Sequence, residues 1–171
     1  MKFQTGDLVV YGTNGVCKIT EIVSRTFYQI SKQYYVLHPI HDPKEVIYIP
    51  VDSKASLQKM RPVLSSQEIY DLIHQMPNTQ PCDWVDNDNQ RKRRFQEILS
   101  RGSRTELMQM IRTLYHQQQK RISAGKKLSS SDEHFFHEAE NLLYEEFAVS
   151  LHLKQDQVLP FLIEQFRLQQ S

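Results

Sequence analysis

The chain changes its hydrophobic pattern at one stretch, Arg61-Pro62-Val63-Leu64-Ser65-Ser66-Gln67-Glu68. Before it, short runs of β-branched and aromatic residues alternate with turn residues, which is typical of strands. After it, apolar residues recur three and four positions apart, which indicates amphipathic helices. The last four residues of the stretch form a capping box, the usual signal for a helix start. We therefore predict an α+β protein with two domains, residues 1–62 and residues 63–171.

The first domain is predicted to be a small β-barrel. A turn between the first two strands is expected at Gly12-Thr13-Asn14-Gly15. The apolar runs Tyr34–Leu37 and Val46–Ile49 are expected to be separate strands, because prolines interrupt the segment from His38 to Pro43 between them. Five short strands separated by turns are typical of an SH3-like or Tudor-like barrel. The expected strands are Asp7–Tyr11, Val16–Val23, Tyr34–Leu37, Val46–Ile49 and a shorter one near Leu57 to Arg61.

The second domain is predicted to contain about five helices. Ser65 and Ser103 each begin a capping box, Ser130-Ser131-Asp132-Glu133 is expected to cap the fourth helix, and Asp156 the fifth. The second helix follows Trp84 and ends at Gly102. Pro160 is tolerable in the fifth helix only in or near its first turn. The apolar stripe of the third helix is expected to contain Leu107, Met110, Ile111, Leu114 and Tyr115.

Charge is segregated along the chain although the net charge is only +1. Residues 91–127 carry eleven Lys and Arg against two Glu, a net charge of +9, whereas residues 128–171 carry −6. The positive segment can form a local basic patch on a nearly neutral molecule. The chain has no apolar run of the roughly 20 residues that span a bilayer and no signal-peptide pattern, so we expect a cytoplasmic protein. Its two cysteines, Cys17 and Cys82, are expected to be free thiols.

The only tryptophan stands just ahead of the densest run of positive charge. Turn-forming residues flank Trp84 on both sides, which suggests that the indole is exposed. Arg91, Lys92, Arg93 and Arg94 then open the second helix. An aromatic wedge beside a basic helix can hold a phosphate backbone and press on a base step. The alternative is that Trp84 anchors the loop to the core and that the cations are a solvated face, since tryptophan is usually well buried.

Catalysis has no candidate residues in this sequence. It has no P-loop, no glycine-rich nucleotide signature and no Gly-x-Ser-x-Gly elbow. His134 and His137 stand three residues apart on one helix, but no third metal ligand is indicated, so a surface pair is favoured over a metal site. We predict a protein that is not an enzyme, with no cofactor and no metal.

One combination of motifs is spread over nearly the whole chain. It consists of Phe3, Gly6-Asp7, Val9-Val10-Tyr11, Gly15, Tyr34-Tyr35-Val36-Leu37, Ile49-Pro50, Arg61, Trp84, Gly102, Ile111-Arg112-Thr113-Leu114 and Leu128-Ser129. Together these residues resemble the CarD/CdnL family of bacterial transcription regulators. The opening Gly-Asp and the strand after it also resemble the polymerase-binding module of transcription-repair coupling factors.

The resemblance implies a Tudor-like domain that binds the RNA polymerase β subunit, with Arg25 just after the second strand as a contact. Tyr48 stands where some members place a second polymerase-contacting arginine. It also implies a helical domain that meets promoter DNA in the minor groove at the upstream edge of the transcription bubble, with Trp84 as the wedge. The expected result is stabilisation of the open complex by a monomer that joins the nucleoid through polymerase. The alternative is an adaptor that binds polymerase or another protein without touching DNA.

Overall fold

The computed structural model of the 171-residue chain describes residues 3–169. Its internal contacts form two compact units, Met1–Val63 and Leu64–Ser171. The first unit is built on a five-stranded sheet and the second contains only helices, which confirms the predicted α+β class. The division falls after Val63, one residue beyond the end of the domain expected over residues 1–62. No helix within residues 3–169 is both long and apolar enough to cross a membrane.

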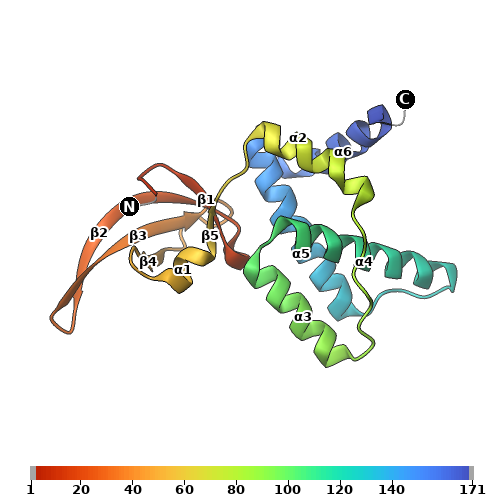
Figure 1. Ribbon diagram of the computed structural model, residues 1–171, viewed down its shortest axis with the longest axis horizontal. Coiled ribbons are helices and arrows are strands. Elements are labelled where there is room, and N and C mark those ends of the chain that lie inside the picture. The colour runs from red at the N-terminus through yellow and green to blue at the C-terminus, as the bar shows by residue number, and fades with distance from the viewer. Residues whose placement is uncertain (1–2, 170–171) are drawn as a thin grey trace. The chain divides into compact units, whose positions relative to one another are not determined.

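The sheet of the first unit is antiparallel throughout, with the order β4-β3-β2-β1-β5. Because β4 and β5 are both edges, the sheet is open and barrel-like (Figure 1). A short 3-10 helix, η1 (Gly12–Asn14), joins β1 to β2, and α1 (Lys54–Gln58) precedes β5. The fifth strand was expected from Leu57, but Leu57 lies in α1, whose N-cap is the Ser53 side chain. The strands are β1 Leu8–Tyr11, β2 Val16–Phe27, β3 Ile30–Pro39, β4 Ile47–Pro50 and β5 Met60–Pro62.

Alternate residues of the strands build the core of this unit. In β2, Cys17 and Ile19 belong to the core whereas Lys18 and Thr20 are exposed, as expected for a strand with one face on the core. The apolar core cluster of this unit also includes Phe3, whose ring meets the Tyr35 ring edge-on, with 6.0 Å between the ring centroids. Its buried members are Phe3, Val9, Cys17, Ile19, Tyr35, Leu37, Ile49 and Met60.

The hairpin of β2 and β3 is longer than the sequence pattern predicted. The two strands pair as far as Phe27 and Ile30 and project beyond the rest of the sheet (Figure 1). Tyr28 and Gln29 form the turn with φ of 50° and 64°, a conformation that the strand-pairing geometry requires and that glycine or asparagine usually supplies. Arg25 was expected just after the second strand, but it lies within β2, opposite Lys32.

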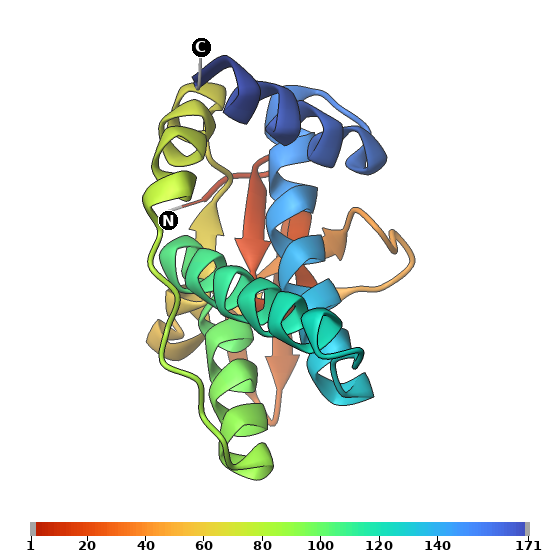
Figure 2. The ribbon, with the colours of Figure 1, turned by 90° about the vertical axis from the view of Figure 1, so that its right-hand side faces the viewer.

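The second unit contains five helices of eight residues or more among the residues described. Figure 2 shows α4 crossing in front of α5, with α3 below and α6 above. Ser65 and Glu68 form the predicted capping box at the start of α2. Ser103 accepts from the backbone N–H of Glu106, but the Glu106 carboxylate accepts from Arg101, so the second predicted capping box is only half formed. The elements are α2 Ser66–Gln75, the 3-10 helix η2 Met76–Asn78, α3 Asp88–Arg101, α4 Arg104–Ser123, α5 Ser130–Leu151 and α6 Gln155–Gln169.

Three details of these helices differ from the prediction. The N-cap of α5 is Ser129, one residue earlier than expected, because its hydroxyl accepts from the N–H of Asp132. In α6, Asp156 lies within the first turn and Pro160 lies inside the helix. Tyr115 is 45% exposed and does not belong to the buried stripe of α4.

Two apolar clusters share α4 and α5. One joins α3 to them through residues such as Phe95, Met110 and Phe136, and the other joins α2 and α6 to them through Ile73, Phe147 and Leu162. The buried carboxylate of Glu146 ties the start of the unit to α5, since it accepts from the backbone N–H of Leu64 at 2.9 Å and from Nε of Arg104 at 3.0 Å. The long helix α5 therefore organises the whole unit.

Candidate functional site

The segment between η2 and α3 has no regular structure but is fixed to α4. It runs along the helical unit from η2 to the start of α3 (Figures 1 and 2). The backbone N–H of Cys82 donates to the hydroxyl of Thr113 at 2.8 Å, and Thr113 is itself buried in α4. This bond places Trp84 two residues further on, above the cluster formed by α3 and α4.

Trp84 is half-buried, so the expectation of an exposed indole is wrong. The ring packs against the apolar cluster that contains Phe95, Ile98 and Met110. Part of the side chain remains accessible, and Arg94 lines the same small crevice as the ring. The position therefore combines features of both alternatives, because one side of the indole is anchored while the rest can reach a ligand.

Arg91 lies over the indole as a buried clamp. Its guanidinium carbon is 4.4 Å from the centroid of the Trp84 ring, a cation–π distance. Nε and Nη2 donate to the two carboxylate oxygens of Asp132, each at 3.0 Å, and Nη2 also donates to Asp88 at 2.7 Å. Nη1 donates to the backbone carbonyls of Val85 at 2.9 Å and Asp86 at 3.3 Å. Arg91 thus joins the Trp84 loop, α3 and α5.

The carboxylates of Asp132 and Asp88 stabilise the positive charge of the buried Arg91 guanidinium. Burial alone lowers the pKa of the Arg91 guanidinium, but the hydrogen bonds to Asp132 and then Asp88 outweigh it, and the pKa stands above its ordinary value. An arginine has five N–H donors, and the five hydrogen bonds of Arg91 engage all of them. Arg91 is 5% exposed, so its position differs from that of the DNA-contacting cation predicted from the sequence.

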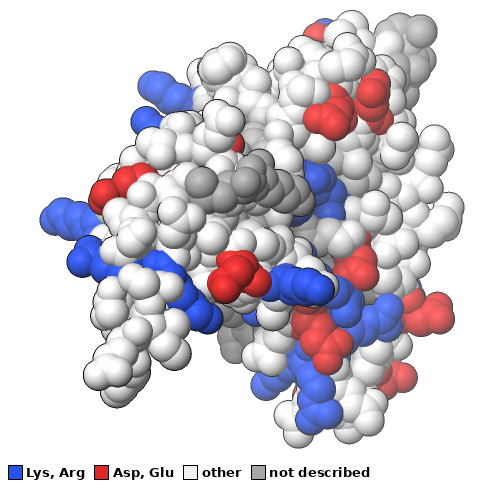
Figure 3. Space-filling view, turned by 60° about the vertical axis from the view of Figure 1, so that its left-hand side comes forward, with Lys and Arg blue, Asp and Glu red and all other residues white. Residues whose placement is uncertain are grey.

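The next three cations are more accessible. Lys92 and Arg93 are exposed and Arg94 is half-buried beside Trp84. None of the three forms an ion pair with any residue in the range 3–169. Lys and Arg side chains are interspersed with Asp and Glu over the lower part of the helical unit, at the height of α3 (Figure 3). The free positive charge of α3 therefore lies at Lys92, Arg93 and Arg94.

The structure also brings together the two positions predicted to contact polymerase. The Arg25 guanidinium carbon lies 5.9 Å from the centroid of the Tyr48 ring, which is 48% exposed. Tyr34 meets Tyr48 edge-on at 6.4 Å and Phe27 at 6.2 Å. Ring contacts therefore run from Phe27 through Tyr34 to Tyr48 on β4, and Tyr28 is 99% exposed at the tip of the hairpin. These residues and Arg25 are here called the hairpin surface, made of Arg25, Phe27, Tyr28, Tyr34 and Tyr48.

The histidine pair on α5 forms surface contacts with glutamates. Nε2 of His134 lies 3.2 Å from Glu138, and His137 lies 3.9 Å from Glu133 and 4.0 Å from Glu140. Within residues 3–169, no group of three His, Cys, Asp or Glu side chains is placed to hold a metal ion. Cys17 and Cys82 are free thiols.

Sequence reasoning missed two residues of the site, Asp132 and Asn87. Asp132 is 1% exposed and stands 41 residues from Arg91, so no local pattern predicts their pairing. Asn87 caps α3 by accepting from the N–H of Gln90 at 3.0 Å. An Asn followed three residues later by Gln is a helix-start signal, and it marks where α3 begins.

Family comparison covers both units of the chain. Residues 3–64 match the family model for the CarD-like/TRCF RID domain. Residues 68–162 match the family model for the CarD C-terminal domain. The comparison with curated proteins found no match.

Proposed function

Because this chain belongs to the CarD family, non-enzymatic transcription regulators that interact with RNA polymerase, we propose that it stabilises the melted promoter by joining polymerase to DNA. The first unit binds the β subunit of polymerase. The second places Trp84 in the minor groove at the upstream edge of the transcription bubble. The resemblance predicted from the sequence motifs is confirmed by the two family matches, and the finer assignments are our proposal.

The observation that carries this proposal is the fixed, half-accessible indole of Trp84. A wedge that separates base steps must hold its position against DNA, and inserting it costs a few kcal/mol of unstacking. Arg91 covers one face of the ring at 4.4 Å, and the apolar cluster supports the side chain from below. An indole held in this way loses little conformational freedom when it meets a base step.

The exposed cations of α3 supply the phosphate contacts in this proposal. Lys92 and Arg93 have no acidic partner in the described chain, and Arg94 adjoins the Trp84 crevice. Each cation that neutralises a phosphate releases a condensed counterion, which strengthens binding at low salt. Arg91 is assigned a positioning role, because its five donors are already engaged within the protein.

The hairpin surface is proposed as the polymerase contact. Aromatic residues and arginine are enriched in protein interfaces and carry much of their binding energy. Arg25 is held beside Tyr48, and the exposed Tyr28 extends the same surface to the tip. Binding through this surface raises the effective concentration of the helical unit at the promoter, so its own affinity for DNA need not be high. The near-neutral net charge of +1 fits that arrangement.

The test is the lifetime of the promoter open complex with purified RNA polymerase and the full chain. We expect the wild-type protein to lengthen it, Trp84→Ala to abolish the effect while still binding polymerase, and Arg25→Glu to abolish both. If Trp84→Ala is folded, binds polymerase and lengthens the lifetime as well as the wild type, the wedge is refuted. Absence of any cross-link between α3 and promoter DNA in that complex would favour the adaptor that binds polymerase without touching DNA.

A further inference from the structure

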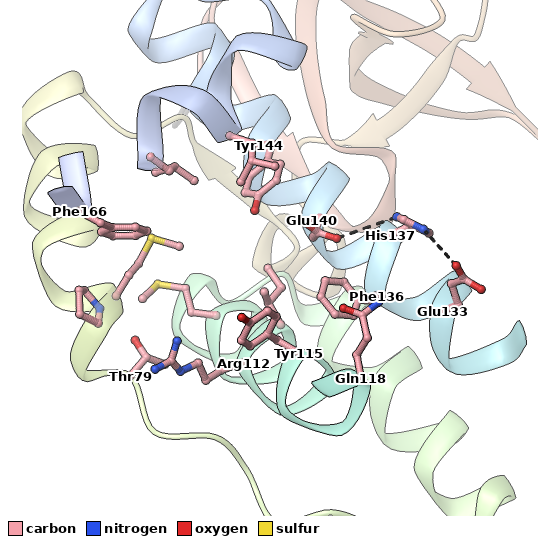
Figure 4. A pocket seen from close by; sticks show the side chains of 16 residues that line it. Thr79, Arg112, Tyr115, Gln118, Glu133, Phe136, His137, Glu140, Tyr144 and Phe166 are labelled. Carbon is pink, nitrogen blue, oxygen red and sulfur yellow. Dashed lines mark ion pairs between the residues drawn. The ribbon is translucent and has the colours of Figure 1, made fainter. Parts of the chain in front are cut away.

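The helical unit contains a second site, separate from Trp84, where a large cavity meets an unpaired arginine. The cavity has a volume of about 620 Å³ and lies between η2, α4, α5 and α6 (Figure 4). Pockets of roughly 300–1,000 Å³ are the usual size for small-molecule sites. Trp84, Arg91 and the exposed cations of α3 do not line it, so the proposed DNA contact makes no use of it.

The walls of the cavity are mostly apolar. Met108 and Ile111 come from α4, Phe136 from α5, and Leu162 and Phe166 from α6. The charged side chains lie on two sides of the cavity. Figure 4 shows Arg112 next to Thr79 on one side and Glu140, His137 and Glu133 on the other. A mainly apolar cavity with a few placed polar groups is the typical composition of a ligand site.

Arg112 is the feature that indicates the ligand's charge. Its Nε is buried and has no hydrogen-bond partner, and the side chain forms no ion pair with any residue from 3 to 169. A buried donor without a partner costs about 1–3 kcal/mol, and more when the group is charged. A carboxylate satisfies a guanidinium through two parallel hydrogen bonds, which a neutral group does not match.

The carboxylate of Glu140 on the opposite wall has neighbours of its own. It lies 4.0 Å from the His137 ring and interacts with the Tyr144 hydroxyl. Burial raises the pKa of the Glu140 carboxyl and of the Tyr144 hydroxyl, as expected for a wall shielded from water. Among the residues described, Arg112 is therefore the one lysine or arginine of this cavity, and it has no acidic partner.

We propose that this cavity binds a small carboxylate with an apolar body, whose carboxylate pairs with Arg112 and whose body lies against Met108, Leu162 and Phe166. The positive charge of the Arg112 guanidinium, which has no acidic partner among the residues described, favours a ligand with a negatively charged group. The apolar walls contributed by α4 and α6 select an alkyl or aryl body, because burying apolar surface is favourable by about 25 cal/mol per Å². This site goes beyond the proposed function and does not depend on it.

The experiment titrates the full chain with decanoate by calorimetry, with 1-decanol and acetate as probes of the body and the head alone. Decanoate is expected to bind saturably with one molecule per chain, and both partial probes more weakly. Arg112→Gln should weaken decanoate by roughly tenfold to a hundredfold and leave decanol unchanged, since a hydrogen bond to a charged group has that value. Arg121→Gln, on the same helix but outside the cavity, is the matched control.

A second pair of variants keeps the test valid if Arg112→Gln is poorly folded. Leu159 lines the cavity and Ile163 does not, yet both lie on α6 and are 48% and 59% exposed. Leu159→Glu should weaken decanoate because it adds a negative charge at the cavity wall, whereas Ile163→Glu should not. Absence of saturable decanoate binding, or equal affinity in Leu159→Glu and wild type, overturns the proposal. So does preference for a leucine-rich helical peptide over decanoate, which would make the cavity a peptide groove.

Discussion

Asp132→Asn removes one charge from the clamp that holds Trp84, with almost no change in side-chain volume. Asp132 and Arg91 are 1% and 5% exposed, so the substitution leaves a buried guanidinium without its main counter-charge. Breaking a buried pair in this way costs about 3–5 kcal/mol. Since small domains are stable by only about 5–15 kcal/mol, roughly a fifth or more of the stability of the helical unit is at stake.

The control for this prediction is Asp88→Asn. Asp88 also bonds to Arg91, at 2.7 Å, but its side chain is 76% exposed. An exposed ion pair contributes at most about 1 kcal/mol, because water and salt screen it. Both variants remove one carboxylate from the same arginine. A large cost for Asp132→Asn beside a small one for Asp88→Asn therefore isolates the effect of burial.

The assay is urea unfolding of the full chain, followed by far-ultraviolet circular dichroism for the helices and by Trp84 fluorescence for the clamp. Because Trp84 is the only tryptophan, its emission reports on the site directly. We expect Asp132→Asn to lower the midpoint strongly and to shift the emission of the still-folded protein to the red. A loss below about 1 kcal/mol with unchanged emission would refute the argument that the clamp positions the indole.

The other predictions concern the surfaces of the two units. Trp84→Ala should cost less than the about 3–5 kcal/mol typical of a fully buried aromatic residue, because the ring is only partly buried, and denaturation measures this. Charge reversal of Lys92 and Arg93 should flatten the salt dependence of promoter engagement by about one unit of log–log slope per lost phosphate contact, and an unchanged slope would show that they only solvate α3. Arg25→Glu should abolish binding to the β subunit and change the free energy of unfolding by less than about 0.5 kcal/mol. The matched control Lys18→Glu, on the same strand, should have an equally small effect on stability and should bind the β subunit normally.

Local patterns in the sequence predicted most of the elements of the fold. Alternating β-branched residues located the strands of the first unit, and Ser65, Ser103 and Gly102 located helix ends, because each of these signals acts within a few residues. The β2–β3 hairpin was underestimated because its outer half is exposed on both faces and therefore lacks alternation. Its turn, Tyr28 and Gln29, has none of the residues that usually mark such a conformation.

The candidate site was predicted less completely than the fold. Residue type alone singled out Trp84 and the basic run as candidates, but it did not show which of Arg91, Lys92, Arg93 and Arg94 are buried and which are exposed. The burial of each cation depends on which side of α3 faces α5. On α5, Asp132 pairs with Arg91, 41 residues away in the sequence. Four consecutive cations on a helix point in different directions, so at most some of them can share a surface. Only the tertiary structure separates the buried Arg91 from the exposed cations.

The clamp also explains how the wedge and anchor alternatives for Trp84 can be separated by experiment. Arg91→Met replaces the guanidinium with an apolar side chain. Combined with Asp132→Asn, it leaves neither of the two buried charges of the pair in place. The double variant should therefore recover much of the stability that Asp132→Asn loses alone. The indole would then still be packed on its apolar side but would lack the cation over its face. If the cation positions the wedge, the double variant will be stable and bind polymerase yet lengthen the open complex less than wild type. If it lengthens the open complex fully, Arg91 serves only the stability of the helical unit.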